Sequence, residues 1–458
     1  MGRIILATNR TSIHGQWSSR WAFILAATGS AVGLGNIWKF PYITGENGGG
    51  AFVLLYLFCV ALIGIPVMMA EVLIGRYGRQ SPINTMRSLS KEMGRSPAWS
   101  LLGWMGVLAG FIILSYYSVI AGWGIAYIFR TASGTFDGAT ADGVTSIFGA
   151  LVGDPEKLLA WHTLFIVMTT IVVARGVKGG LEKAVKILMP GLFLLLVVLL
   201  GYSISTPGFS KGVSFLFSVD FSKITSAGVL TAMGHAFFTL SLGMGAIMVY
   251  GSYLPQNASI AKTSIIISLM DTVVALLAGL VIFPIVFSNG LEPGSGPGLI
   301  FQTLPIAFGQ MPGGALFGTL FFILLVFAAW TSAISLIEPA VAYLVENKGY
   351  SRVYAAVSVS IAIWFLGIAT VLSFSTWAEF KPMLDKTLFD LFDGLTANIM
   401  LPLGGLLISI YVGWVMHNKA VEEELALSAS SYKLWLFIIR YISPPAIILV
   451  FLHAFEII

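Results

Sequence analysis

The chain has 458 residues, of which 57% are hydrophobic and only 10% are charged. A soluble domain carries about 25% charged residues, so this composition excludes a protein whose whole surface faces water. The net charge of +4 is too small to suggest nucleic acid as a partner, and the single cysteine, Cys59, excludes a disulfide framework or a cysteine-based metal site. The mean hydropathy of +0.90 indicates a polytopic membrane protein.

Eleven stretches of the sequence are apolar enough and long enough to cross a bilayer, which takes about 20 residues. They are approximately residues 18–46, 50–77, 98–130, 158–175, 183–205, 226–255, 261–288, 314–345, 352–373, 388–416 and 434–456. Long apolar runs separated by short polar loops favour helices over a barrel. We therefore predict an all-α polytopic membrane protein with eleven transmembrane helices, and short surface helices in the connectors 206–225 and 289–313.

Basic residues concentrate in alternate loops. They occur before the first span (Arg10, Arg20), after the second (Arg76, Arg79) and after the fourth (Lys178, Lys183). By the positive-inside rule the N-terminus is cytoplasmic, and an odd number of spans then puts the C-terminus outside. We expect a multi-pass protein of a bacterial-type inner (cell) membrane.

The first span is interrupted at residues 29–41, GSAVGLGNIWKFP. Three glycines in seven residues (Gly29, Gly33, Gly35) make a poor continuous helix, because each weakens a helix by about 1 kcal/mol relative to alanine. Backbone groups freed in hydrocarbon cost several kcal/mol each unless a partner satisfies them. The break therefore predicts a partner, which is another helix, water, an ion or a ligand.

A second interruption, FFTLSLGMG at residues 237–245, lies in the sixth span. Paired breaks at corresponding places in two halves indicate a transporter binding site at the membrane midplane, whereas either break alone is explained by close helix packing. We interpret residues 1–458 as a single transporter domain with a 5+5 inverted repeat. Its repeats are 18–205 and 226–416, with an extra helix at 434–456.

Few polar side chains lie within the predicted spans. Asp271 is mid-span, where a carboxylate must be protonated, paired or bound to a cation. Thr331 and Ser332 are adjacent, and such hydroxyls either bond back to the preceding turn or offer oxygens to a hard cation. Lys39 and Asp393 lie near span ends, where they can reach water.

Several motifs together are typical of one family. They are GSAVGLGNIWKFPY at 29–42, ENGGGAF at 46–52, GIP at 64–66, Glu71 with GRYG at 75–78, FFTLSLG at 237–243 and AAWTS at 328–332. The chain resembles the neurotransmitter:sodium symporter family over nearly its whole length. It is most similar to bacterial members that take up hydrophobic amino acids.

The resemblance implies one amino-acid site, two sodium sites and two gates. The substrate site would comprise Ala31, Gly33, Leu34, Gly35, Ile113, Tyr117, Phe238, Thr239, Ser241, Met244, Ser332 and Leu336. The first sodium site would comprise Ala31, Asn36, Thr239 and Asp271, and the second Gly29, Val32, Ala328, Thr331 and Ser332. Lys39 and Asp393 would form the outer gate, and Trp17, Tyr253 and Glu346 would belong to the inner gate.

Several positions depart from the family pattern, among them Lys39 in the outer gate, where arginine is common. Many members have asparagine where this chain has Asp271. Chloride-dependent relatives use an anion beside the first sodium. The fixed carboxylate of Asp271 would supply that negative charge, so chloride is not expected. Members often have arginine at the position of His14, which leaves His14 and Arg10 as alternative cationic partners of Glu346. His235 stands where glutamine is usual and is interpreted as a hydrogen-bonded packing residue.

The predicted function is sodium-coupled symport of hydrophobic or aromatic L-amino acids by alternating access. The alternative is a proton-coupled amino-acid transporter or exchanger of the same architecture that uses Asp271 or Glu71. A membrane enzyme is not favoured, because the sequence offers no nucleophile–base pair, metal cluster or P-loop. The expected partners are the amino-acid substrate and the lipid bilayer, with no obligate protein partner.

Overall fold

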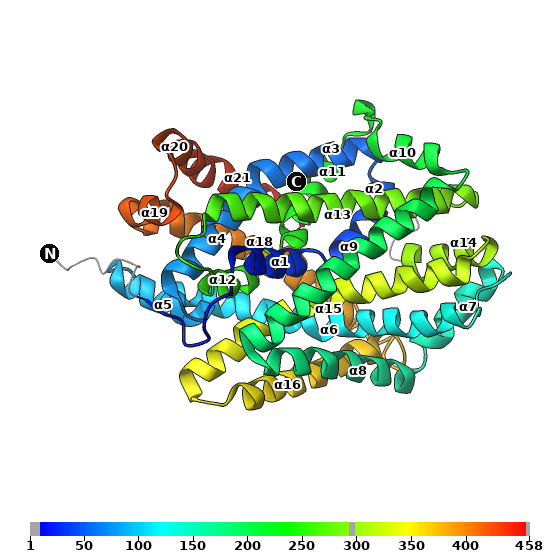
Figure 1. Cartoon of the computed structure of the whole chain (residues 1–458), viewed down its shortest axis with the longest axis horizontal. Helices are drawn as coiled ribbons and strands as arrows, with labels where there is room; N and C mark the ends of the chain where they lie inside the picture. Colours follow the sequence, from blue (N-terminus) through cyan, green and yellow to red (C-terminus); the bar gives the residue numbers. More distant parts are fainter. Residues whose placement is uncertain (1–9, 293–297, 455–458) are drawn as a thin grey trace.

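The computed structural model describes residues 10–292 and 298–454, which form helices and no β-strand. The long helices lie side by side along the long axis of the molecule (Figure 1). The short helices α5 and α19 lie at one end of the molecule, whereas α7, α10 and α14 lie at the opposite end. The predicted all-α class is confirmed.

The first part of the chain forms α1 (Arg20–Ala31), η2 (Gly35–Lys39), α2 (Phe40–Glu46), α3 (Gly50–Cys59), η3 (Val60–Gly64), α4 (Ile65–Gly78), α5 (Pro82–Glu92), η4 (Pro97–Trp99), α6 (Ser100–Ala132), α7 (Ala141–Val152), α8 (Pro155–Ala174), η5 (Val177–Glu182), α9 (Lys183–Ile204), α10 (Phe209–Phe217) and η6 (Phe221–Lys223). The second part forms α11 (Ser226–Thr239), α12 (Ala246–Ser252), α13 (Ile260–Ser288), η7 (Leu299–Thr303), α14 (Leu304–Gln310), α15 (Gly314–Lys348), α16 (Arg352–Ser373), α17 (Leu388–Asp393), η8 (Gly394–Met400), α18 (Leu401–Ile410), η9 (Tyr411–Val415), α19 (Asn418–Leu425), α20 (Ala429–Phe437), η10 (Ile438–Ile442) and α21 (Ser443–Ala454).

The helix lengths support nine or ten spans. Nine helices in the described part are long and apolar enough to cross a membrane, and α1 with η2–α2, bent by 50° at the break, gives a tenth. The expected span 226–255 is divided into α11 and α12, and neither part alone reaches the length of a span. Eleven spans therefore stay a prediction, and the predicted end of the last span at 455–456 lies outside the described residues.

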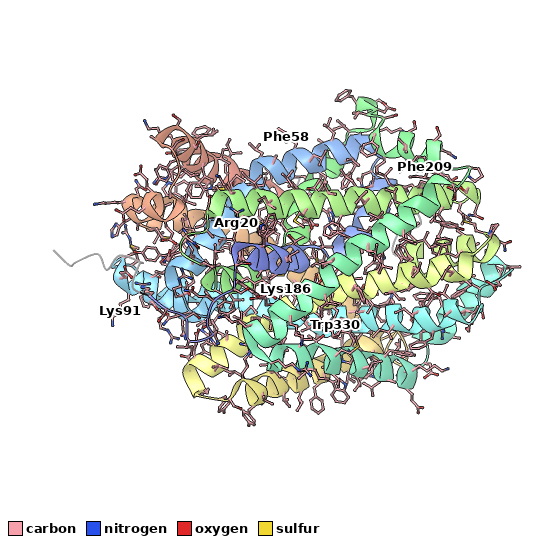
Figure 2. The ribbon with its side chains drawn as sticks, viewed as in Figure 1. Arg20, Phe58, Lys91, Lys186, Phe209 and Trp330 are labelled. Carbon is pink, nitrogen blue, oxygen red and sulfur yellow. The ribbon has the colours of Figure 1, made fainter. Side chains whose placement is uncertain are left out.

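The surface of the bundle is apolar where a bilayer would cover it. Phe58 on α3, labelled in Figure 2, is 62% exposed, and Leu194 on α9 is 65% exposed. This apolar surface suits lipid contact.

The two long connectors carry the expected short helices. The first, 206–225, contains α10, and the second, 289–313, contains α14. Residues 293–297 of the second connector lie outside the described residues.

Two long helices, α6 and α15, pack along each other and hold the broken helices in place. A Cβ on Gly110 of α6 would lie 2.8 Å from the carbonyl oxygen of Leu336 on α15, so the two helices approach more closely than a side chain allows. α1 packs against α13 and α15, and α12 packs against α4. The two breaks therefore meet inside the bundle.

Candidate substrate and ion site

The first helix break turns backbone groups into the interior. α1 ends at Ala31, the next residue, Val32, leaves the helical region with a ψ of 104°, and η2 begins at Gly35. The Gly33 N–H donates to Asn36 Oδ1 at 3.0 Å, and the Leu34 N–H donates to the Tyr117 hydroxyl at 3.1 Å. These bonds partly satisfy the backbone groups that the break frees.

The second break, between α11 and α12, depends on positive φ angles. Ser241, Gly243 and Gly245 have φ of 55°, 79° and 75°. A Cβ on Gly243 would lie 2.6 Å from the Leu401 carbonyl oxygen, so glycine is required there by both conformation and space. The carboxylate of Glu71 is fully buried and accepts the Gly243 N–H at 3.0 Å, which ties the break to α4.

A cavity of about 30 Å³ lies between the two breaks. It is lined by Ser30, Ala31, Gly33, Leu34, Gly35, Ile113, Tyr117, Phe238, Ser241, Met244, Ser332 and Leu336. These include every predicted substrate residue except Thr239. Ser30 lines the cavity although the sequence did not single it out; its hydroxyl donates to Ser335 Oγ at 2.7 Å.

The space at the first break depends on the missing side chain of Gly33. A Cβ there would lie 2.5 Å from Ser332 Oγ and 2.8 Å from the Tyr117 hydroxyl. Gly33→Ala is therefore expected to weaken substrate binding by about 5- to 140-fold, because overpacking costs about 1–3 kcal/mol. Equilibrium binding of a radiolabelled amino acid measures this.

The control for that substitution is Gly234→Ala, whose new Cβ would meet only Val450 at 3.7 Å. It should bind substrate like the unmodified protein. Equal losses in both variants would contradict a specific role for the space at Gly33.

Asp271 is fully buried and surrounded by neutral hydrogen-bond donors. Asn36 Nδ2 lies 2.8 Å from Asp271 Oδ1, Thr239 Oγ1 lies 3.0 Å from Oδ2, and the Tyr56 hydroxyl lies 3.4 Å from Oδ2. No Lys, Arg or His of residues 10–292 and 298–454 pairs with this carboxylate. The cluster thus offers oxygen atoms and a formal charge without a cationic side chain, which suits a bound cation or a bound proton.

Ser332 gathers three carbonyl groups from the end of α1. Its Oγ lies 3.3 Å from the oxygen of Gly29, 3.0 Å from that of Ser30 and 3.2 Å from that of Val32. Thr331 instead bonds back to the Ala328 carbonyl at 3.0 Å. Converging carbonyl and hydroxyl oxygens are the ligands that hard cations prefer.

A larger cavity of about 420 Å³ lies on the far side of Phe238 and has a mainly aromatic lining that includes Lys39 and Asp393. The expected outer gate pair is not closed: within the described residues Lys39 and Asp393 form no ion pair. Lys39 Nζ lies 4.6 Å from the centroid of the Phe238 ring, and Asp393 accepts from the Tyr116 hydroxyl at 3.2 Å. Both charges line this cavity, and each has a different neighbour.

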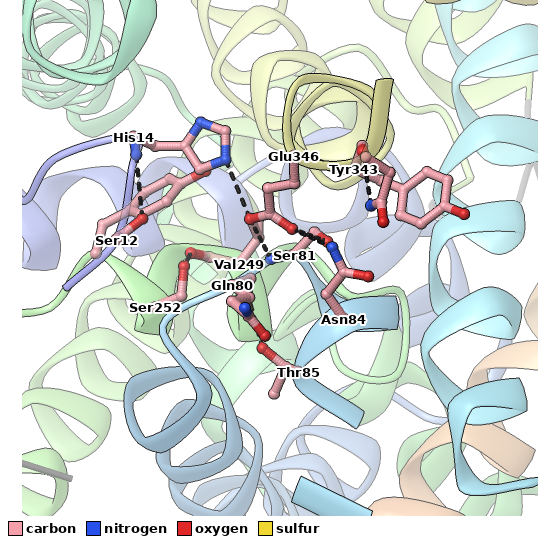
Figure 3. A network of polar contacts seen from close by, with 12 residues as sticks. Ser12, His14, Gln80, Ser81, Asn84, Thr85, Val249, Ser252, Tyr343 and Glu346 are labelled. Carbon is pink, nitrogen blue, oxygen red and sulfur yellow. Dashed lines mark hydrogen bonds and ion pairs between the residues drawn. The ribbon is translucent and has the colours of Figure 1, made fainter. Parts of the chain in front are cut away.

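The side of the bundle opposite this larger cavity is closed by contacts around Glu346, which Figure 3 shows from close by. Glu346 accepts from His14 Nε2 at 3.1 Å, from the Ser81 N–H at 2.7 Å and from Asn84 Nδ2 at 2.8 Å (Figure 3). Of the two candidate partners, His14 is therefore the one that contacts Glu346. Arg10 pairs with Glu92 instead.

Trp17 lies deeper on the same side and is 2% exposed. Its backbone N–H donates to the Tyr253 carbonyl at 3.1 Å, and its Nε1–H donates to the Tyr250 carbonyl at 3.1 Å. The Tyr253 hydroxyl donates to Glu338 at 2.8 Å. Tyr253 thus belongs to this closure through Trp17 and Glu338.

His235 differs from its sequence interpretation. It packs against both Phe40 and Tyr56, with ring centroids 5.9 Å and 5.4 Å away, so the packing role is present. The hydrogen-bonded role was wrong, because neither ring nitrogen has a partner in the described part of the chain. Aromatic neighbours fill the space where a donor or acceptor was expected.

Paired helix breaks around a buried cavity define the class of secondary membrane transporters. The sequence profile of the sodium:neurotransmitter symporter family matches residues 14–141 and 151–458. The chain belongs to that family and is a sodium-dependent, multi-pass membrane transporter.

Two curated relatives and one solved structure are similar over nearly their full length. The uncharacterized sodium-dependent transporter YhdH of Bacillus subtilis is 40% identical over 442 residues, covering 96% of this chain and 97% of the relative. An uncharacterized sodium-dependent transporter of Haemophilus influenzae is 36% identical, covering 95% and 97%. The crystal structure of MhsT in complex with L-phenylalanine has a TM-score of 0.88 at 43% identity, covering 96% of this chain and 99% of MhsT.

Proposed function

We propose that this protein couples sodium entry to the uptake of hydrophobic or aromatic L-amino acids by alternating access. The observation that carries the proposal is the position of the cavity between two helix breaks, with one oxygen-rich cluster at Asp271 and another at Ser332. The cavity lining is largely apolar, with Ile113, Met244 and Leu336, and methionine adapts to substrates of different shape. The similarity to a transporter crystallised with L-phenylalanine supports this substrate class.

The proposed roles divide the site into three parts. The first sodium would bind Asp271 with Asn36, Thr239 and the Ala31 carbonyl, and the second would bind Ser332 with Thr331 and the Gly29, Val32 and Ala328 carbonyls. The substrate carboxylate would meet the backbone near Gly33 and the Tyr117 hydroxyl, with Phe238 as the lid. A carboxylate that also contacts the first sodium makes sodium and substrate stabilise each other reciprocally.

The proposed topology places the N-terminus in the cytoplasm and the C-terminus outside. The basic residues at the ends of α4 and α8 support this orientation. Residues 18–205 and 226–416 would be the two inverted repeats, and the closure at Trp17, Tyr253 and Glu346 would be the cytoplasmic gate. The membrane potential then adds about 2.3 kcal/mol per charge per 100 mV to the driving force.

The test is competition binding on the purified protein, with the twenty amino acids tested against a labelled aromatic substrate at several sodium concentrations. Large apolar amino acids should compete, and competition should require sodium. Competition confined to charged or very small amino acids would contradict the proposed substrate class.

A proton-coupled transporter is the second candidate, supported by two buried carboxyl groups. Asp271 has no cationic partner in the described residues, and Glu71 Oε1 has no hydrogen-bond partner there. Sodium titration of substrate binding at fixed pH separates the candidates. Binding that does not depend on sodium would favour protons.

We also expect uptake to be independent of chloride, because the carboxylate of Asp271 is built into the first ion cluster. Replacing external chloride with gluconate at constant sodium should change the initial uptake rate by less than about twofold. Uptake that vanishes in gluconate would contradict this role of Asp271.

A further inference from the structure

A separate groove opens on the outer surface of the bundle where α8 ends and α9 begins. Its volume is about 210 Å³, and its walls include Val172 of α8, Arg175 just after α8, Gly179 and Lys183 near the start of α9, and Trp330 of α15. We propose that this groove binds an anionic phospholipid of the surrounding bilayer, a site that goes beyond the transport function proposed above.

Two positive charges lie at one end of the groove. Arg175 and Lys183 are exposed, and neither pairs with a carboxylate among residues 10–292 and 298–454. Lys186, one turn further along α9, is by contrast paired with Glu182 at 2.5 Å. Arginine and lysine bind phosphate groups well, and basic pockets between transmembrane helices bind lipid headgroups.

The groove continues into an apolar surface away from these charges. Ile187, which lines the groove, follows Lys183 by four residues and so lies about 6 Å further along the helix axis. It is 63% exposed, and further along α9 Leu194 and Val197 are 65% and 61% exposed. This order of charge and then apolar surface matches a phospholipid, whose phosphate is followed by acyl chains.

A third feature is an aromatic side chain in the wall of the groove. Trp330, labelled in Figure 2, lies on α15, which packs against α9. An indole ring in the wall gives an acyl chain an aromatic surface to pack against, a contact that a free phosphate ion does not make.

The test is native mass spectrometry of the full-length protein released from nanodiscs that contain phosphatidylcholine and phosphatidylglycerol. The unmodified protein should retain phosphatidylglycerol. The double variant Arg175→Gln/Lys183→Gln should bind it about 30-fold more weakly, because each basic side chain near an anionic headgroup contributes about 1 kcal/mol. Gly179→Leu should also lose the lipid by filling the groove; a Cβ at Gly179 meets nothing within 4 Å, so this variant should fold.

The matched control is Lys178→Gln/Lys433→Gln, which removes two exposed charges from positions that do not line the groove. It should retain phosphatidylglycerol within about twofold of the unmodified protein. The proposal is overturned if the control loses as much lipid as Arg175→Gln/Lys183→Gln. It is also overturned if phosphatidylcholine is retained equally well, or if inorganic phosphate displaces the lipid as effectively as added phosphatidylglycerol.

Discussion

Asp271→Asn should raise the sodium concentration needed for half-maximal substrate binding by about 100-fold or more. The buried carboxylate is surrounded by Asn36, Thr239 and Tyr56, all neutral, so its charge is the main attraction that this cluster offers a cation. Removing one partner of a buried ion pair costs about 3–5 kcal/mol, and every 1.4 kcal/mol is a factor of ten. Scintillation proximity binding of a labelled aromatic amino acid across a sodium titration measures the shift.

Two comparisons make that result specific. Ser268→Ala alters the same helix three residues earlier, where the hydroxyl contacts Met68 Sδ at 3.8 Å, and it should leave the sodium dependence unchanged. In Asp271→Asn, added chloride should recover part of the lost binding, because a free anion can replace the missing charge. An unchanged sodium dependence in Asp271→Asn, with its pH dependence abolished, would favour the proton-coupled alternative.

Local sequence patterns predicted the helix breaks because their causes are local. Glycines weaken a helix wherever it lies, and the positive φ angles of Gly243 and Gly245 are the structural counterpart of the FFTLSLGMG stretch. The span count was harder to establish, because α11 and α12 are each too short to be recognised as a span by length.

The partners across the bundle could not be predicted from residue spacing. Asn36 and Asp271 are 235 positions apart, and only the packing of η2 on α13 brings them to 2.8 Å. The assignment of these residues to one cluster came from the family resemblance. His14 and Arg10 were equivalent candidates for Glu346, and the path of the N-terminal segment decides between them by placing Arg10 beside Glu92.

Whether the two charges of the outer gate pair depends on the conformational state of the transporter. Within the described residues Lys39 and Asp393 line the same 420 Å³ cavity without pairing, while the contacts at His14, Trp17 and Glu346 on the opposite side are formed. A sequence specifies which charges are available but not which of two alternating states a structure represents. The closed side is therefore where a substitution should change the balance of states most.

Trp17→Ala should shift the protein toward a state open on the side of Glu346 by about 100-fold or more. Trp17 is 2% exposed and its Nε1–H donates a hydrogen bond to the Tyr250 carbonyl of α12, and truncating a buried tryptophan costs about 3–5 kcal/mol. The contacts of this side chain close only one side, so the cost falls on that state. Hydrogen-exchange mass spectrometry in sodium should show faster exchange in α1, with α2 as the internal reference.

Trp21→Ala is the matched control, because Trp21 is 56% exposed and should change little. Equal acceleration in both variants, or in α2 as much as in α1, would indicate general destabilisation and contradict a gating role for Trp17.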